Sequence, residues 1–194
     1  MTNTPPAGPP GAADDDEPAA FSPAWTPSPV EARVLGAATG AERETLEAFL
    51  DYLRDAVVRK ISGVSEEDAR RRLVPSHTTL AGMLPHLILV EKNWFHRTLT
   101  GRTRAEIGIE LSDPDDSWAV PEGATVASLI AEYERVCARS REIAAGYKLD
   151  DHAPHEEVGD VSLRWILVHM IEETGRHAGH LDILREQLDG AKGQ

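Results

Sequence analysis

The segment 162–190 constrains the fold more than any other part of the sequence, because it carries an unbroken helical pattern. Its core-facing positions lie three or four residues apart, with one interval of about three helical turns, and are occupied by Leu163, Ile166, Met170, Leu181, Leu184 and Leu188. Ser162 is a typical N-cap, and Gly190 is a typical residue after a helix end. The pattern predicts one long amphipathic helix, which must bury its apolar face against other helices.

Three other segments show the same periodicity, and each ends near a glycine. We predict helices from about Ala41 to Ile61, from Thr78 or Thr79 to about Leu99, and from about Thr125 to Ala145. Pro85 either kinks the second of these helices or marks its true first turn. The sequence shows neither strand-like alternation nor an internal repeat, so we expect an all-α four-helix bundle.

The two ends of the sequence differ in character. Residues 1–28 are rich in Pro, Ala and Gly, contain an acidic cluster and lack Lys and Arg, which predicts a disordered tail. We expect residues 29–194 to form a single domain. Within it, the polar stretch 101–124 is a long connection, ordered in part by Trp118 and suited to covering the mouth of a site.

Charge and composition exclude several classes of function. A net charge of −13 argues against nonspecific binding to nucleic acid and to anionic membranes. No apolar run approaches the roughly 20 residues needed to span a bilayer, and no secretory signal is evident. The single Cys137 fits a reducing compartment, so we expect a cytoplasmic protein. We expect the chain to be a monomer or a homodimer.

Potential metal ligands are concentrated in the last predicted helix. Glu173 and His177 lie one turn apart, with His177 in the middle of the apolar face and Glu173 at its edge. A buried Glu and His are costly without partners, and a divalent cation would satisfy both. A hydrogen-bonded pair without metal is the alternative, and the helix by itself does not decide between them.

A three-residue site needs a ligand from another helix, because one helix cannot wrap three of its own side chains around an ion. His86, on the flank of the second helix, is the best candidate, although a packed, hydrogen-bonded histidine is the ordinary interpretation of such a position. His169 and His180 are alternatives that share the helix of Glu173 and His177. Two imidazoles and one carboxylate would leave coordination positions open for water or a thiol.

The run 162–190 resembles the C-terminal signature of the DinB/YfiT-like superfamily, and 84–95 resembles its second helix. The resemblance covers roughly residues 30–190 and is strongest to an uncharacterised actinobacterial branch, related to mycothiol-dependent maleylpyruvate isomerases. It implies an up-down four-helix bundle with a divalent metal held by His86, Glu173 and His177. Many members have His in place of Glu173, whereas those isomerases have Glu. His180 replaces a usual Gln.

The resemblance implies a metal-dependent thiol S-transferase or isomerase, in which the metal activates a low-molecular-weight thiol such as mycothiol towards an electrophilic substrate. Zinc is the expected metal, with nickel, iron and manganese as alternatives. Glu91 and His180 are secondary candidates for a catalytic role, and Glu91 is equally suited to a plain buried hydrogen bond. Trp94 and Trp165 could line the cavity or belong to the core. A non-catalytic metal-binding stress or interaction protein, or a metal-free bundle, remains open.

Overall fold

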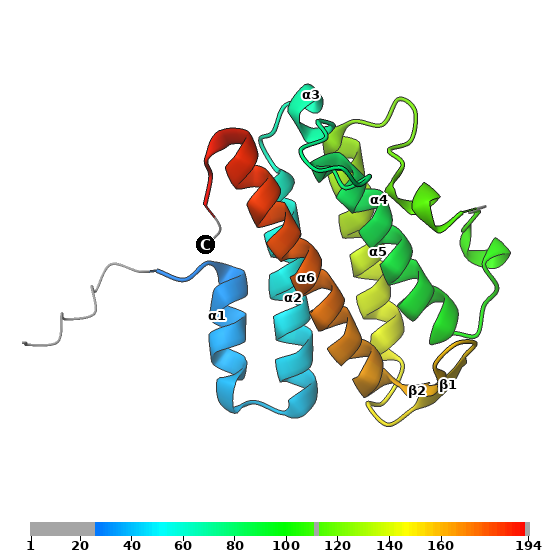
Figure 1. Ribbon diagram of the computed structural model, residues 1–194. Coiled ribbons are helices and arrows are strands. Elements are labelled where there is room, and N and C mark those ends of the chain that lie inside the picture. Colours follow the sequence, from blue (N-terminus) through cyan, green and yellow to red (C-terminus); the bar gives the residue numbers. More distant parts are fainter. Residues whose placement is uncertain (1–25, 111–112, 193–194) are drawn as a thin grey trace, which may run out of the picture.

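The computed structural model describes residues 26–110 and 113–192, which form a helical bundle with one small hairpin (Figure 1). The helices are α1 (Pro29–Gly36), α2 (Glu42–Ile61), α3 (Glu66–Ala69), α4 (Leu80–Glu91), α5 (Val126–Ala145) and α6 (Leu163–Asp189). Short helical turns η1 (Ala37–Thr39), η2 (Lys92–Thr98), η3 (Ala105–Ile107) and η4 (Pro114–Trp118) join them. The strands β1 (His152–His155) and β2 (Gly159–Ser162) pair antiparallel.

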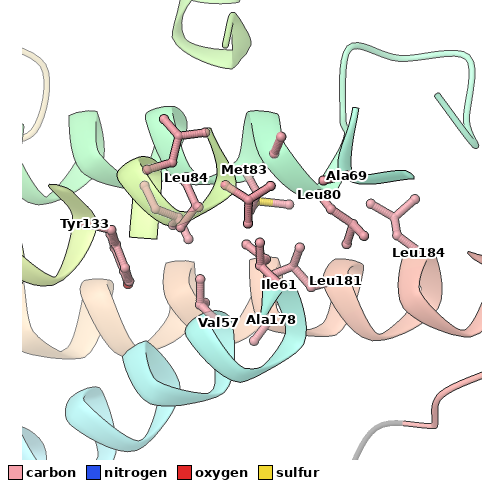
Figure 2. Close-up of a cluster of buried hydrophobic side chains, with 14 of the residues drawn as sticks. Val57, Ile61, Ala69, Leu80, Met83, Leu84, Tyr133, Ala178, Leu181 and Leu184 are labelled. Carbon is pink, nitrogen blue, oxygen red and sulfur yellow. The ribbon is translucent and has the colours of Figure 1, made fainter. Parts of the chain in front are cut away.

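The four long helices α2, α4, α5 and α6 bury their apolar faces against one another, which confirms the predicted helical fold. Two buried clusters form the core, one towards each end of the bundle. Figure 2 shows the first cluster, in which Ile61, Leu80 and Leu181 from three different helices meet. The second cluster lies near the hairpin and joins Leu50 of α2 and Phe95 of η2 to apolar residues of α6.

The helices do not simply alternate in direction along the chain, as the up-down description of the superfamily suggests. In Figure 1, α2 and α6 run one way and α4 and α5 run the other way. Leu80 and Val126, at the starts of α4 and α5, share the first cluster, whereas Phe95 and Ala144, near the ends, share the second. The connection from 99 to 125 therefore returns along the whole bundle, and it carries η3 and η4.

Local sequence signals account for most helix ends. The side chains of Ser162, Thr79 and Thr125 each accept a hydrogen bond from a backbone N–H in the first turn of α6, α4 and α5. Gly190 ends α6 with φ of 76°, a left-handed conformation that glycine adopts without strain. Pro85 lies within α4 and does not end it. The π-helical turns of η2 then continue α4 to Thr98.

Two elements differ from the sequence-based expectation. The sequence shows no strand-like alternation, and we expected no strands, but His152–His155 pairs with Gly159–Ser162. Strands of four residues, one of which contains Pro154, are too short to show an alternating pattern. Helix α1 was also not predicted, although Ser28 and Glu31 form a capping box at its start.

The predicted disordered tail falls almost entirely on residues 1–25, which lie outside the described residues, so that expectation remains a prediction. In the part of the chain that the structure describes, no helix is both long enough and apolar enough to cross a membrane.

Candidate metal centre

Three predicted ligands from two helices meet at one point. His86 comes from α4, and Glu173 and His177 come from α6. Glu173 Oε1 lies 3.1 Å from His177 Nε2 and 3.6 Å from His86 Nε2. One ligand atom from each of the three residues lies within 4.8 Å of those of the other two. The structure therefore brings together the three side chains that the sequence singled out, while metal binding itself stays a prediction.

The crossover connection between α4 and α5 holds His86 in place. Ser117 Oγ lies 3.2 Å from His86 Nδ1, and the indole of Trp118 stacks on the imidazole at a centroid distance of 4.0 Å. Because Nδ1 faces Ser117, Nε2 faces Glu173 and His177. A metal-binding histidine commonly has its second ring nitrogen fixed by such a hydrogen bond. The long connection thus covers the candidate site, as its length suggested.

The site favours an ionised carboxylate. Hydrogen bonds from His177 and then from His86 hold the pKa of Glu173 well below its usual range, although burial acts in the opposite direction. His177 is buried, and its Nδ1 has no hydrogen-bond partner among the described residues. Glu173 and His86 each keep 17% of their side chains exposed. A carboxylate and two imidazoles therefore point at one partly accessible spot.

This donor set fits a divalent transition metal. Two nitrogens and one oxygen are the ligand types of catalytic zinc sites, which keep a further position for water or substrate. The three atoms come from two helices fixed by a common core, so the site is preformed. An oxygen of Glu173 lies within 3.6 Å of both imidazole nitrogens, so one cation placed among the three ligand atoms would satisfy all three groups.

The remaining candidates of the same helix lie outside this group. His180 is exposed, and its ring centroid is 5.5 Å from that of His177. His169 stacks on Trp165 and also contacts Trp94, so it belongs to a ring cluster one turn before Glu173. Glu172 pairs with Arg176 on the exposed face of the helix.

Glu91 lies in a buried ion pair, away from the three candidate ligands. Its side chain is 1% exposed, and its two carboxylate oxygens accept hydrogen bonds from Nε and Nη2 of Arg54 at 2.7 and 2.8 Å. The structure therefore favours the buried hydrogen bond over proton transfer. Sequence reasoning missed Arg54 as the partner. The available signal was a charged residue at a helical position between the apolar Leu50 and Val57.

Trp94 and Trp165 are neither buried core residues nor neighbours of the three candidate ligands. The two indoles lie 5.3 Å apart and tilted, and Trp165 is 39% exposed. Trp94 also stacks on His155 of β1 at 4.7 Å. Together with His169 they form a partly exposed ring cluster where η2, α6 and the hairpin meet.

A comparison with models of protein families shows which family this chain resembles. A model described as mycothiol-S-transferase matches residues 45–190, which include all three candidate ligands and the four long helices apart from the first turn of α2. The chain belongs to the mycothiol-S-transferase family. No curated protein matches the chain.

Membership of the mycothiol-S-transferase family confirms the DinB/YfiT-like resemblance and narrows its functional meaning. It implies an S-transferase that uses the thiol of mycothiol and an electrophilic partner. In this mycothiol-S-transferase chain, His86, Glu173 and His177 are the group of residues that could bind a metal.

Proposed function

We propose that this chain joins mycothiol, through its sulfur, to a small electrophile at a zinc site formed by His86, Glu173 and His177. The observation that carries the proposal is the convergence of two imidazole nitrogens and one carboxylate oxygen within 4.8 Å, in a chain matched by the mycothiol-S-transferase model. Zinc is favoured over nickel, iron or manganese because tetrahedral sites with these ligands and an open position are typical of zinc.

When bound, the metal would lower the pKa of a thiol at the open position, so that sulfur reacts as a thiolate at neutral pH. Glu173 contributes a negative charge that its low pKa keeps ionised. His86 is oriented by Ser117 and Trp118, so its Nε2 stays directed at the centre. His177 lies within the apolar face of α6, where water has little access.

The reaction itself is a substitution or addition at carbon. The thiol loses its proton to solvent, and the sulfur lone pair forms a C–S bond with the electrophilic carbon. With an alkyl halide such as monochlorobimane, chloride departs with the electron pair of the broken C–Cl bond. The product is a fluorescent thioether, so the transfer can be followed directly.

The test uses the zinc-loaded chain with mycothiol and monochlorobimane. We expect conjugation faster than the uncatalysed rate in the wild-type chain and in Glu172→Gln, a matched control one residue from Glu173. His177→Ala should lose this acceleration. Conjugation at the same rate in the wild-type chain and in His177→Ala would overturn the proposal. If zinc binds to and stabilises the chain without any turnover, the non-catalytic metal-binding alternative is correct.

A further inference from the structure

A second cavity lies away from the candidate metal centre, between α1, α2 and α5. Its volume is about 720 Å³, within the range of small-molecule sites in proteins. Neither His86, Glu173 nor His177 lines it. Its apolar wall includes Leu50, Phe95 and Leu167 from three elements, so it reaches into the second core cluster.

An unusual charge network faces this cavity. Asp51 accepts hydrogen bonds from Arg33 of α1, Arg54 of α2 and Arg141 of α5 at 2.8, 3.1 and 2.8 Å. Arg54 also forms the bidentate pair with Glu91. Three guanidinium groups thus share two carboxylates, so they carry more N–H donors than these carboxylates use.

The other charged residues of the lining balance one another. Glu47 pairs with Arg43, and Asp55 pairs with Arg59, so each of these acids has its own cation. Glu134 also lines the cavity and is exposed to solvent, so the lining holds four arginines and four carboxylates. The attraction for an anion therefore comes from the guanidinium donors that Asp51 leaves unused, not from a net positive charge.

Arg33 and Arg141 have unused donors for such an anion. Each makes one hydrogen bond to Asp51, through Nη1 of Arg33 and Nε of Arg141. Among the described residues, the other nitrogens of these two guanidinium groups make no hydrogen bond to protein. The two side chains are 59% and 47% exposed, which places them where the cavity opens to solvent. Guanidinium groups held in this way suit a carboxylate.

The interior of the cavity offers both apolar surface and one polar group. The Tyr133 hydroxyl is buried beside the Cys137 thiol and has no oxygen or nitrogen partner among the described residues. Burial raises the pKa of Tyr133 well above 10, so the hydroxyl stays protonated and can donate. A ligand body in this space would therefore contact apolar side chains and one O–H donor.

We propose that this cavity binds an amphipathic organic monocarboxylate. The carboxylate lies between Arg33 and Arg141, and the apolar body extends along Leu50, Phe95 and Leu167 towards Tyr133. This site is independent of the proposed thiol chemistry, because it shares no lining residue with the metal centre.

Isothermal titration calorimetry with octanoate tests the proposal on the full chain, with octanamide as the uncharged analogue. We expect octanoate to bind with one site per chain and octanamide to bind at least about tenfold more weakly. A chain carrying both Arg33→Gln and Arg141→Gln should lose about tenfold in octanoate affinity. Arg139→Gln should not, because Arg139 lies on α5 but pairs with exposed Glu142 outside the cavity.

The same titration with His177→Ala tests whether octanoate binds at the metal centre instead. We expect its octanoate affinity to equal that of the wild-type chain, which excludes coordination of the carboxylate at the metal centre. The proposal is overturned if octanoate does not bind, if octanamide binds equally well, or if affinity depends on His177 and not on the two arginines. The comparison of octanoate with octanamide needs only the wild-type chain, so it remains decisive even if the double variant does not fold. None of these outcomes depends on transferase activity.

Discussion

The imidazole of His86 stacks on the indole of Trp118, with the two ring planes 9° from parallel. The neighbouring Ser117 contacts Nδ1 of the same imidazole. A histidine of α4 is therefore positioned by a segment about 30 residues later in the chain, within the crossover to α5. This relationship makes the crossover part of the candidate site and leads to the first prediction.

Ser117→Ala should weaken zinc binding by about tenfold, because loss of the contact to Nδ1 frees the His86 ring to rotate. Competition with a chromogenic chelator measures the affinity. Ser62→Ala is the matched control, since the Ser62 hydroxyl is exposed and bonds only to the carbonyl of Val58. Equal zinc affinities in the two variants would show that Ser117 does not orient His86.

Zinc should stabilise the fold, because a ligand that binds only the native state shifts the unfolding equilibrium. At free zinc about 1,000-fold above the dissociation constant, the gain is about 4 kcal/mol. Thermal unfolding with and without a chelator measures it. The melting temperature should rise with zinc in the wild-type chain and in Glu172→Gln, but not in His177→Ala. A rise in His177→Ala of the same size would locate the metal elsewhere.

Glu91→Gln should destabilise the chain by roughly 3–5 kcal/mol, because it leaves the buried Arg54 without its bidentate partner. Urea unfolding measures this loss. Zinc affinity should stay unchanged, since Glu91 contacts Arg54 and not the three candidate ligands. If Glu91→Gln is fully folded and equally stable but loses transferase activity, the catalytic role considered for Glu91 is correct instead.

Asp51→Asn should cost about 3 kcal/mol at pH 7, because three arginines lose a shared negative charge. Burial opposes ionisation of Asp51, but the hydrogen bond and charge of Arg141, with Arg54 and Arg33, outweigh it and lower the pKa below 3.8. A lowered pKa in the folded state stabilises the protein above pH 3.8, and this stabilisation is lost as the pH falls below that value.

The difference in stability between the wild-type chain and Asp51→Asn should therefore be constant from pH 5 to pH 7 and shrink below about pH 3.8. Denaturant unfolding at a series of pH values measures it. A difference that persists undiminished at the lowest pH would mean that the charge of Asp51 contributes little, and that the substitution acts through packing alone.

The sequence by itself determined the four long helices and two of the three candidate ligands, Glu173 and His177. Helical periodicity, capping residues such as Ser162 and stops such as Gly190 act within a few residues, so they can be read along the chain. The same periodicity places Glu173 and His177 one turn apart. His86 was selected with the help of the superfamily resemblance, and the structure brings it beside them.

Only the tertiary structure decided which distant residues contact one another, both around those ligands and elsewhere in the bundle. The parallel course of α4 and α5, the stacking of Trp118 on His86, and the pairing of Arg54 with Glu91 all join residues far apart in the sequence. Such contacts depend on how the crossover returns along the bundle and on which helix faces meet, and no local pattern encodes either. The cavity around Asp51 has the same origin, because α1, α2 and α5 contribute the three arginines that bind Asp51.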